Sequence, residues 1–248
     1  MFKHSCSACS MNKICIPLGL DAGGIGRLEN IVKFTSVKHA GDKIVDQGEG
    51  FTKVFAVKSG MCKSYRLDEA GVEYIQSFHL PGELFGLDAI YAKQYGFTVE
   101  VLETSVVCEI NYEELETLCV ELPALQRQLF NLLSRDIYNS HVNPIEHFDQ
   151  SAEQKLAGFL HNLLSRLQAR GQVSTELHLP MSRRDIANHL ELAPETISRL
   201  LKRFQESGVI TIDNRLVTIE DAKELNRMVH CHARETLENI EKFSRVAS

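Results

Sequence analysis

The segment MSRRDIANHLELAPETISRLLKRF, residues 181–204, contains two short helical patterns joined by a tight turn. Ser182 and Asp185 have the spacing of a capping box, which places the start of the first helix at this serine. Residues 191–193 form the turn, and Pro194 suits the first position of the next helix because its missing N–H needs no partner there. The segment therefore predicts a helix-turn-helix.

The second helix of this motif has one apolar and one polar face. Its apolar residues recur at i, i+3, i+4 and i+7, as in a helix with one buried stripe, and they are Ile197, Leu200, Leu201 and Phe204. The same spacing relates the polar residues Glu195, Ser198, Arg199 and Lys202. In a recognition helix such side chains contact base edges, since arginine can bind guanine through two hydrogen bonds and a carboxylate can accept one from cytosine. Glu195 and Arg199 are placed to share one G·C pair.

Two strand patterns, residues 209–212 and 216–219, follow the second helix with a tight connection at residues 213–215. They predict a wing beside the helix-turn-helix, with Arg215 near its tip. Phosphate contacts need cations around the recognition helix rather than on its base-reading positions. The candidates for contacts with the DNA backbone are Arg183, Arg184, Lys202, Arg203 and Arg215.

The charge is unevenly distributed along the 248 residues, whose formal net charge is −6. Residues 1–150 contain 13 Lys and Arg against 20 Asp and Glu, a balance of −7, whereas residues 151–219 contain 9 against 7, a balance of +2. DNA binding requires positive charge at the docking face and not in the whole chain. Double-stranded DNA is therefore an acceptable partner for the carboxy-terminal part.

The amino-terminal half has a different pattern of apolar and turn-forming residues. From Phe34 to Ile110, short apolar runs alternate with turn signals such as Gly48-Glu49-Gly50 and Pro81-Gly82, which predicts a β-roll or jelly roll. Apolar residues at helical spacing then predict a long helix that ends near Asn143-Pro144. This helix either packs on its own chain or pairs with its copy as a coiled coil.

The sequence contains neither an apolar run of the ~20 residues that a transmembrane helix needs nor a signal-peptide pattern at its start. We expect a cytoplasmic protein with no membrane partner. In a reducing compartment, clustered cysteines indicate metal or redox chemistry rather than disulfides.

Three of the seven cysteines, Cys6, Cys9 and Cys15, form a C-x2-C-x5-C pattern. Three thiolates on a short loop suit three corners of an iron–sulfur cluster, with a fourth ligand from elsewhere. A closed zinc site of four thiolates fits almost equally well on spacing alone. A thiol–disulfide switch is the third alternative and requires lowered thiol pKa values.

The segment Glu195-Thr196-Ile197-Ser198-Arg199-Leu200-Leu201, followed by Phe204 and Gly208, resembles the recognition helix of the cyclic-AMP receptor protein and FNR superfamily, with the serine of the FNR type. The β-roll, long helix and winged helix match that superfamily over nearly the whole chain. One departure is Ala193, where relatives carry a Ser or Thr helix cap. The resemblance implies a homodimer on a palindrome resembling TTGAT-N4-ATCAA, with Glu195, Ser198 and Arg199 contacting bases.

The resemblance also implies which group senses the signal and which residues hold it. FNR-type proteins share the amino-terminal cysteine spacing, and their fourth ligand lies in a segment similar to residues 102–110, which makes Cys108 the fourth ligand of a [4Fe–4S] cluster. The cluster is therefore preferred to zinc. Cys62 and Cys119 are expected to be buried in the core, and Cys231 to belong to an ordinary helical tail.

Cyclic-nucleotide-binding relatives carry a cassette resembling F-G-E-x-x-L and a downstream arginine. Here the first run is Phe85-Gly86-Leu87-Asp88-Ala89-Ile90, and residues 95–100 contain no arginine. A buried phosphate would lack a cation, so no cyclic nucleotide is expected.

The family's dimer seam falls on the long helix, where the expected contacts are Leu125, Leu129, Leu132, Leu133 and Ile137. Ser140 stands where a typical FNR-type seam has an aspartate, so like charges would not face each other across the dimer. This absence puts strict control of dimerisation by oxygen in doubt.

We predict an α+β chain with five segments. They are a cysteine-rich cluster-binding segment at 1–20, a β-roll sensor domain at 21–115, a dimerisation helix at 116–147, a winged helix-turn-helix DNA-binding domain at 148–220 and a helical tail at 221–248. The expected function is oxygen-responsive regulation of transcription, with RNA polymerase recruited or blocked. The rivals are a small-effector sensor on the same DNA-binding module and, in another class, an iron–sulfur redox protein.

Overall fold

The structure, a computed structural model, describes residues 5–147, 150–171 and 175–229, and within helix α4 it describes side chains as far as Ile137. The predictions for Ser140 and Cys231 and for the tail beyond residue 229 therefore lie outside the described residues. The chain divides into two compact units, Met1–Ser140 and His141–Ser248, and each is described by itself. Among the described residues, no helix combines the length and the apolar character needed to cross a membrane.

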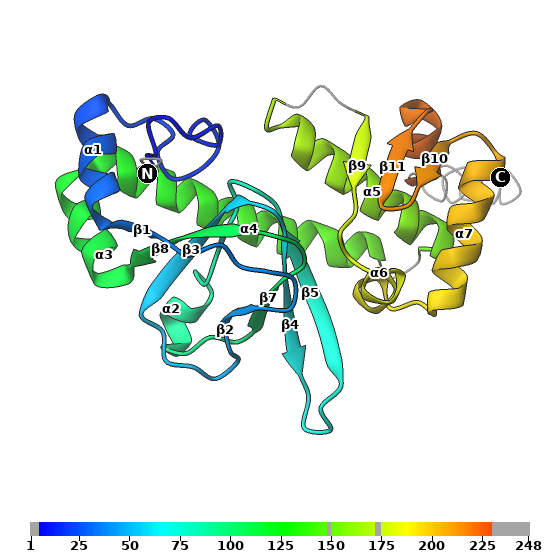
Figure 1. Ribbon diagram of the computed structural model, residues 1–248, viewed down its shortest axis with the longest axis horizontal. Coiled ribbons are helices and arrows are strands. Elements are labelled where there is room, and N and C mark those ends of the chain that lie inside the picture. Colours follow the sequence, from blue (N-terminus) through cyan, green and yellow to red (C-terminus); the bar gives the residue numbers. More distant parts are fainter. Residues whose placement is uncertain (1–4, 148–149, 172–174, 230–248) are drawn as a thin grey trace, which may run out of the picture. The chain divides into compact units, whose positions relative to one another are not determined.

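The amino-terminal unit is built on two four-stranded antiparallel sheets (Figure 1). One sheet has the strand order β1-β8-β3-β6, with bounds Val32–Phe34, Val106–Asn111, Lys53–Ser59 and Leu84–Phe85. The other has the order β2-β7-β4-β5, with bounds Lys43–Val45, Thr98–Val101, Cys62–Leu67 and Glu73–His79. The predicted β-roll is thus confirmed.

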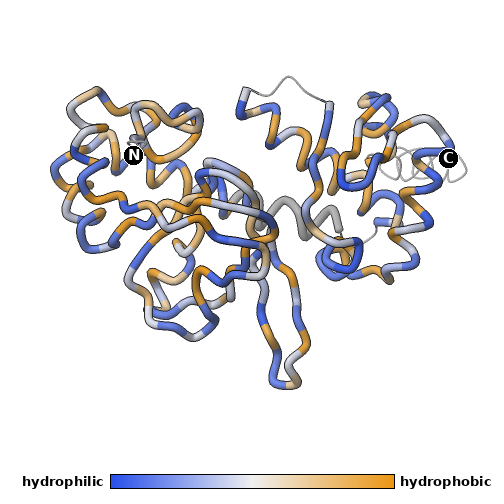
Figure 2. The backbone as a smooth tube through the Cα atoms, in the orientation of Figure 1, coloured by the Kyte–Doolittle hydropathy of each residue, from blue (hydrophilic) through white to orange (hydrophobic). Residues whose placement is uncertain are grey.

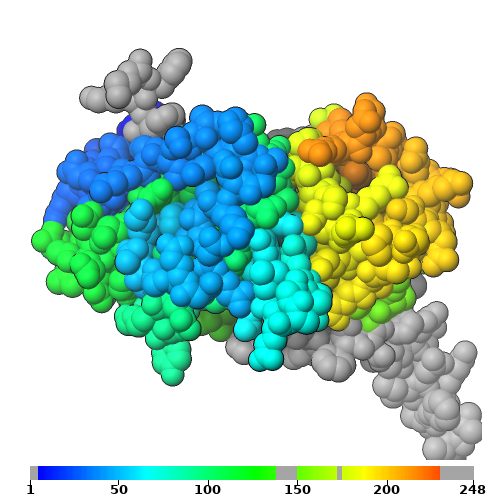
Figure 3. Space-filling view, turned by 60° about the horizontal axis from the view of Figure 1, so that its bottom comes forward, coloured from blue at the N-terminus to red at the C-terminus, as the bar shows by residue number. Residues whose placement is uncertain are grey.

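The two sheets face each other across a core to which both contribute. Phe55 and Phe85 stack in it with ring centroids 5.1 Å apart, and strands of the opposite sheet supply Cys62, Val99 and Val101. The β4–β5 hairpin extends from this core with alternating hydrophilic and hydrophobic residues (Figure 2), the pattern of a strand pair with one solvated face. The hairpin forms part of the exposed surface in the space-filling view, where it is cyan (Figure 3).

The second apolar cluster of this unit covers the outer face of the β1-β8-β3 sheet. Helices α1 (Ala22–Ile31), α3 (Tyr112–Glu121) and α4 (Pro123–His147) contribute to it, together with Ile16 of the amino-terminal loop. The predicted single helix over 116–147 is wrong at its start, because the chain breaks at Leu122 and restarts with proline at the first helical position. The helix also continues beyond Pro144 to His147.

The stripe of α4 that is predicted to pair with a second copy also packs within its own chain. Leu125 and Leu132 are 0% and 4% exposed and lie in the core of their own chain. Leu129 and Leu133 are half-buried against the same core. Of the five predicted seam residues, only Ile137 is largely exposed, at 58%, and the neighbouring Phe130 is equally exposed.

The carboxy-terminal unit contains the predicted winged helix-turn-helix. Its elements are α5 (Ala152–Gln168), β9 (Glu176–His178), α6 (Arg183–Leu190), α7 (Pro194–Glu206), β10 (Ile210–Asp213) and β11 (Leu216–Ile219). Ser182 and Asp185 form the predicted capping box, with Asp185 N donating to Ser182 Oγ at 3.1 Å. Strands β10 and β11 pair antiparallel and turn at Asn214, and β9 joins them as a third strand.

Helix α7 starts at a backbone geometry suited to capping, but Ala193 makes no side-chain cap hydrogen bond. Replacing Ala193 by serine supplies an acceptor for a free N–H of the first turn, so Ala193→Ser should raise the free energy of unfolding by about 1 kcal/mol. Urea denaturation followed by circular dichroism measures this change. The control is Ala193→Val, which adds volume without an acceptor; an equal gain from valine would contradict the capping explanation.

Candidate functional site

The amino-terminal loop carries three of the four predicted ligands through a series of tight turns. Cys9 N donates to Cys6 O at 3.2 Å, Asn12 N to Cys9 O at 3.1 Å, and Cys15 N to Met11 O at 3.0 Å. Each turn reverses the chain within a few residues. Thiols three and six residues apart are therefore held close together without a strand or a regular helix.

The loop rests against the turn between β5 and β6. Ile14 lies so close to Gly82 that a side-chain carbon there would stand 2.6 Å from Ile14 Cδ1. Gly82 also has a φ of 85°, which favours glycine. Its N–H donates to Val57 O at 2.7 Å, so the turn that supports the loop is itself attached to strand β3.

Cys108 comes from a distant part of the chain. It lies on β8, opposite Phe34 of β1 and Ala56 of β3. Its neighbours on the strand alternate, with Val107 in the core between the sheets, and Cys108 packs against the outer cluster beneath the loop. The sheet thus presents this thiol to the loop.

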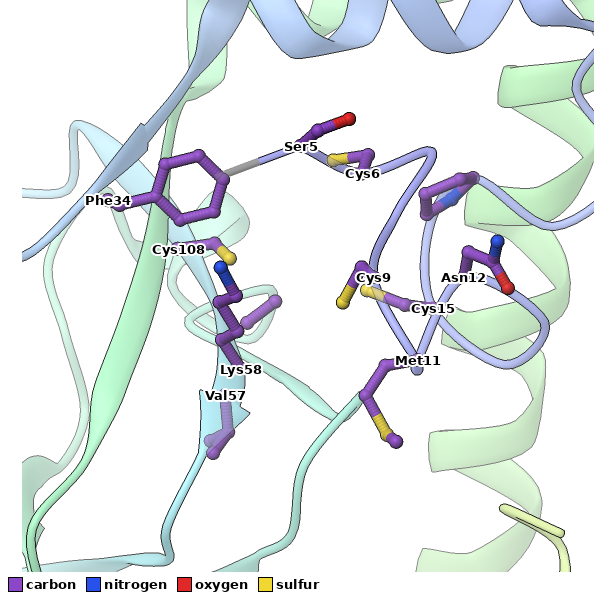
Figure 4. Close-up of a pocket in the computed structure, with 12 residues that line it drawn as sticks. Ser5, Cys6, Cys9, Met11, Asn12, Cys15, Phe34, Val57, Lys58 and Cys108 are labelled. Carbon is purple, nitrogen blue, oxygen red and sulfur yellow. The ribbon is translucent and has the colours of Figure 1, made fainter. Parts of the chain in front are cut away.

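All four predicted ligands line one pocket between the loop and the sheet. Cys6, Cys9, Cys15 and Cys108 point their sulfur atoms into the same space (Figure 4). This space amounts to about 350 Å³, part of it open to solvent. The remaining lining residues are mostly apolar or uncharged: Ser5, Met11, Asn12, Pro17, Phe34, Ala56, Val57 and Lys58.

The pocket raises the pKa of Cys6, Cys15 and Cys108. Burial, with smaller contributions from the neighbouring thiols, raises the pKa of Cys15 and of Cys108 to about 12. Burial and the nearby Glu29 carboxylate raise the pKa of Cys6 to about 11. In the metal-free protein these three thiols are protonated at neutral pH, which is the opposite of what a reactive thiolate switch needs.

Two polar contacts fasten the loop to helices, and sequence patterns gave no sign of either. Glu29 of α1 accepts hydrogen bonds from Ser5 Oγ at 2.6 Å and Ser7 N at 2.9 Å, and these bonds lower the pKa of its carboxyl. Gln128 of α4 is 7% exposed and donates through Nε2 to Cys15 O at 3.3 Å. The loop is therefore joined directly to α1 and α4.

A single zinc ion and an iron–sulfur cluster require different arrangements of the thiols. Among the residues that the structure describes, no three His, Cys, Asp or Glu side chains are grouped as ligands of a single metal ion. A zinc site would need its thiolates about 2.3 Å from one centre. A cluster needs wider spacing, because each thiolate binds a different iron.

The other cysteines lie elsewhere. Cys62 and Cys119 are buried in the two apolar clusters, as predicted for small core residues, and neither lines the pocket. All six cysteines within the described part of the chain are free thiols.

The predicted DNA-contacting residues lie on the surface of the carboxy-terminal unit. Glu195, Arg199 and Lys202 are exposed on α7, and Arg183, Arg184 and Arg215 are exposed on α6 and the wing. Three predicted residues have partners within the protein, and one of them is Lys202, whose Nζ lies 3.6 Å from Glu206 Oε1. Ser198 Oγ donates to Pro194 O at 3.1 Å, and Arg203 forms an ion pair with Glu153 of α5.

The region corresponding to a cyclic-nucleotide cassette is filled by side chains. Leu87, which stands at the glutamate position of the cassette, is 7% exposed in the outer apolar cluster. The ring of Tyr95 lies in the core between the sheets, and its hydroxyl donates to Lys53 O at 2.8 Å. The described side chains therefore provide apolar packing where a nucleotide would need polar partners.

Comparisons with known proteins agree with this architecture. Residues 154–228 match the Crp-like helix-turn-helix domain, and residues 37–121 match the cyclic nucleotide-binding domain. The structure of FixK2 from Bradyrhizobium japonicum superposes with a TM-score of 0.72 at 25% identity, covering 80% of this chain and 97% of FixK2.

Curated relatives match most of the chain. The anaerobic regulatory protein of Haemophilus influenzae is 39% identical over 216 residues, covering 87% of this chain and 84% of the relative. The transcriptional activator protein anr of Pseudomonas aeruginosa is 40% identical over 220 residues, covering 89% and 90%.

These features define a helix-turn-helix transcriptional regulator, not an enzyme. The chain belongs to the FNR-type family within the cyclic-AMP receptor protein and FNR superfamily.

The raised thiol pKa values have a measurable consequence in metal-free protein. At pH 8, Cys15 and Cys108 should react with iodoacetamide more than about tenfold more slowly than the same residues in urea-unfolded chain, because only the thiolate is nucleophilic. Since a pKa near 12 lies far above this pH, the rate should keep rising to pH 10 and beyond. Peptide mass spectrometry measures each site, and a rate that levels off below pH 9 would contradict the assignment.

Proposed function

We propose that this chain is an oxygen-responsive regulator that holds a [4Fe–4S] cluster on Cys6, Cys9, Cys15 and Cys108 and binds DNA as a homodimer. The observation that carries the proposal is the convergence of these four thiols, from segments about 90 residues apart, on one pocket with mostly apolar walls. The names of the relatives, an anaerobic regulatory protein and anr, support control by oxygen supply.

The FNR-type resemblance and the names of the relatives support the cluster over zinc. Four thiolates complete the ligand set of a [4Fe–4S] cluster, and the four predicted ligands line one pocket. When bound, an iron–sulfur cluster supplies a group that reacts with oxygen. The residues of the chain hold this group, shield it with the loop, and connect it to α4 through Gln128 and Ile16.

The proposed dimer uses the outward face of α4. Phe130, Leu133 and Ile137 have the i, i+3, i+7 spacing of a coiled-coil seam, and the first and last are each 58% exposed. A two-fold dimer would place two copies of α7 on two half-sites of a palindrome resembling TTGAT-N4-ATCAA. The bound regulator then recruits or blocks RNA polymerase. Cyclic nucleotide has no part in this proposal, because apolar packing occupies the cassette region.

The first test is metal content after purification without air. Wild-type protein should contain about four iron and four sulfide per chain. Single Cys6→Ala, Cys9→Ala, Cys15→Ala or Cys108→Ala changes should abolish this content, because each removes one of four ligands. The matched controls Cys62→Ala and Cys119→Ala remove buried thiols outside the pocket and should retain the cluster. Stoichiometric zinc, or protein without metal and with intact thiols, would overturn the cluster.

The second test separates base contacts from phosphate contacts on α7. Arg199→Ala should cost about 1–3 kcal/mol on the palindrome and relax the preference at its guanine, with little change on random duplex. Lys202→Ala should weaken binding to both DNAs and reduce the slope of log K against log salt by about one unit. Lys202 is the better phosphate probe because its 3.6 Å pair with Glu206 on the same helix is more exposed, at 76% and 65%, than the pair that joins Arg203 to Glu153 of α5, at 55% and 32%.

Titrations on the palindrome, a G·C-swapped palindrome and random duplex, each at several salt concentrations, measure both effects. Equal loss from Arg199→Ala on all three DNAs would show that Arg199 contacts the backbone, and the proposed orientation of α7 in the major groove would be wrong.

A further inference from the structure

Lys58 is the single charged residue among the described residues that line the cysteine pocket. It lies near the end of β3, where the pairing with β8 shifts register between Val57 and Ser59. Side chains alternate along a strand, so Lys58 lies on the same face of β3 as Val54 and Ala56, which pack in the outer cluster. In Figure 4 its ammonium group lies beside Cys108, facing the same space as the four sulfur atoms.

The ammonium group is held at this position by an aromatic ring. Lys58 Nζ lies 4.6 Å from the centroid of Phe34, which also lines the pocket. A cation over an aromatic face is attracted by the electron density of the ring, and the attraction is stronger where water is excluded. The positive charge of Lys58 also acts on Cys6 and Cys108, two of the four thiols, in the direction that favours their thiolates.

The proposed cluster with its four thiolates carries a net negative charge, which a cation in the pocket would offset. Four thiolates bring more negative charge than the iron–sulfur core offsets, so the proposed group enters the pocket as an anion. A buried anion is costly unless a cation or hydrogen-bond donors compensate it. Net charge and the surrounding dipoles are also among the factors that set the reduction potential of such clusters.

We propose that Lys58 is the charge-compensating residue of the cluster pocket, which strengthens retention of the cluster and raises its reduction potential. This inference rests on the proposed function, since it assumes that the four thiols hold an iron–sulfur cluster. Lys58 is a positioning residue and not a ligand.

The experiment compares full-length proteins purified without air. Lys58→Met removes the charge and keeps an unbranched apolar chain, Lys58→Gln removes the charge and keeps a polar end, and Lys58→Arg keeps the charge. Lys33→Met is the matched control, because Lys33 is an exposed lysine on strand β1 of the same sheet and does not line the pocket. The readouts are iron and sulfide content, the rate of iron transfer to a chelator, and the midpoint potential. Thermal unfolding of each metal-free protein reports the fold.

Lys58→Met and Lys58→Gln should lose iron about tenfold faster than wild type and show a more negative midpoint potential, because a partly buried cation no longer offsets the anion. Lys58→Arg and Lys33→Met should match wild type, and metal-free Lys58→Gln should unfold as wild type does.

Two results would overturn the inference. One is wild-type retention and potential in both uncharged variants, and the other is a loss in Lys58→Arg as large as in Lys58→Met. A wild-type protein without iron would instead refute the cluster proposal itself, so the two failures are distinguishable.

Discussion

The burial of Ile16 is the contact on which the cysteine pocket depends. The loop that carries Cys6, Cys9 and Cys15 forms neither a strand nor a regular helix, so its order must come from side-chain anchors. Ile16 is 2% exposed and lies in the apolar cluster shared by α1, α3, α4 and the outer face of the sheet. Full burial of such a side chain contributes about 1.5–3 kcal/mol. Because Ile16 directly follows Cys15, the same contact fixes the loop opposite Cys108.

The winged helix-turn-helix could be predicted closely because its signals are local. Ser182 and Asp185 are three residues apart, and their hydrogen bonds follow from that spacing alone. The absent cap at Ala193 could be identified in the same way. The four ligands required more than spacing, since only the family resemblance connected Cys108 with the loop. The structure supports that connection through the pairing of β8 with β1 and β3.

Sequence patterns did not predict the contacts between elements that are distant in the chain. Helical spacing placed Leu125 and Leu132 on one apolar face of a helix. It could not show that this face packs against the core of its own chain. Likewise, the ion pair between Arg203 and Glu153 joins residues 50 positions apart, and a list of cations near the recognition helix cannot reveal it. Alternation along β3 puts Lys58 on the same face as Ala56, but strand periodicity cannot show that the loop with three of the thiols covers that face.

Helix α4 has two faces with different partners, and this arrangement gives the proposed sensor a physical route to the proposed dimer. Leu125, Leu132 and Gln128 hold the inward face to the core and to Cys15 O. Phe130 and Ile137 lie on the outward face. Packed helices move as units because protein cores are dense and compress little. A change in the loop that releases the carbonyl of Cys15 leaves the buried amide of Gln128 without its partner, which costs about 1–3 kcal/mol. A displacement of α4 that restores a partner to this amide would also move Phe130 and Ile137, and so alter the seam that sets the spacing of the two recognition helices.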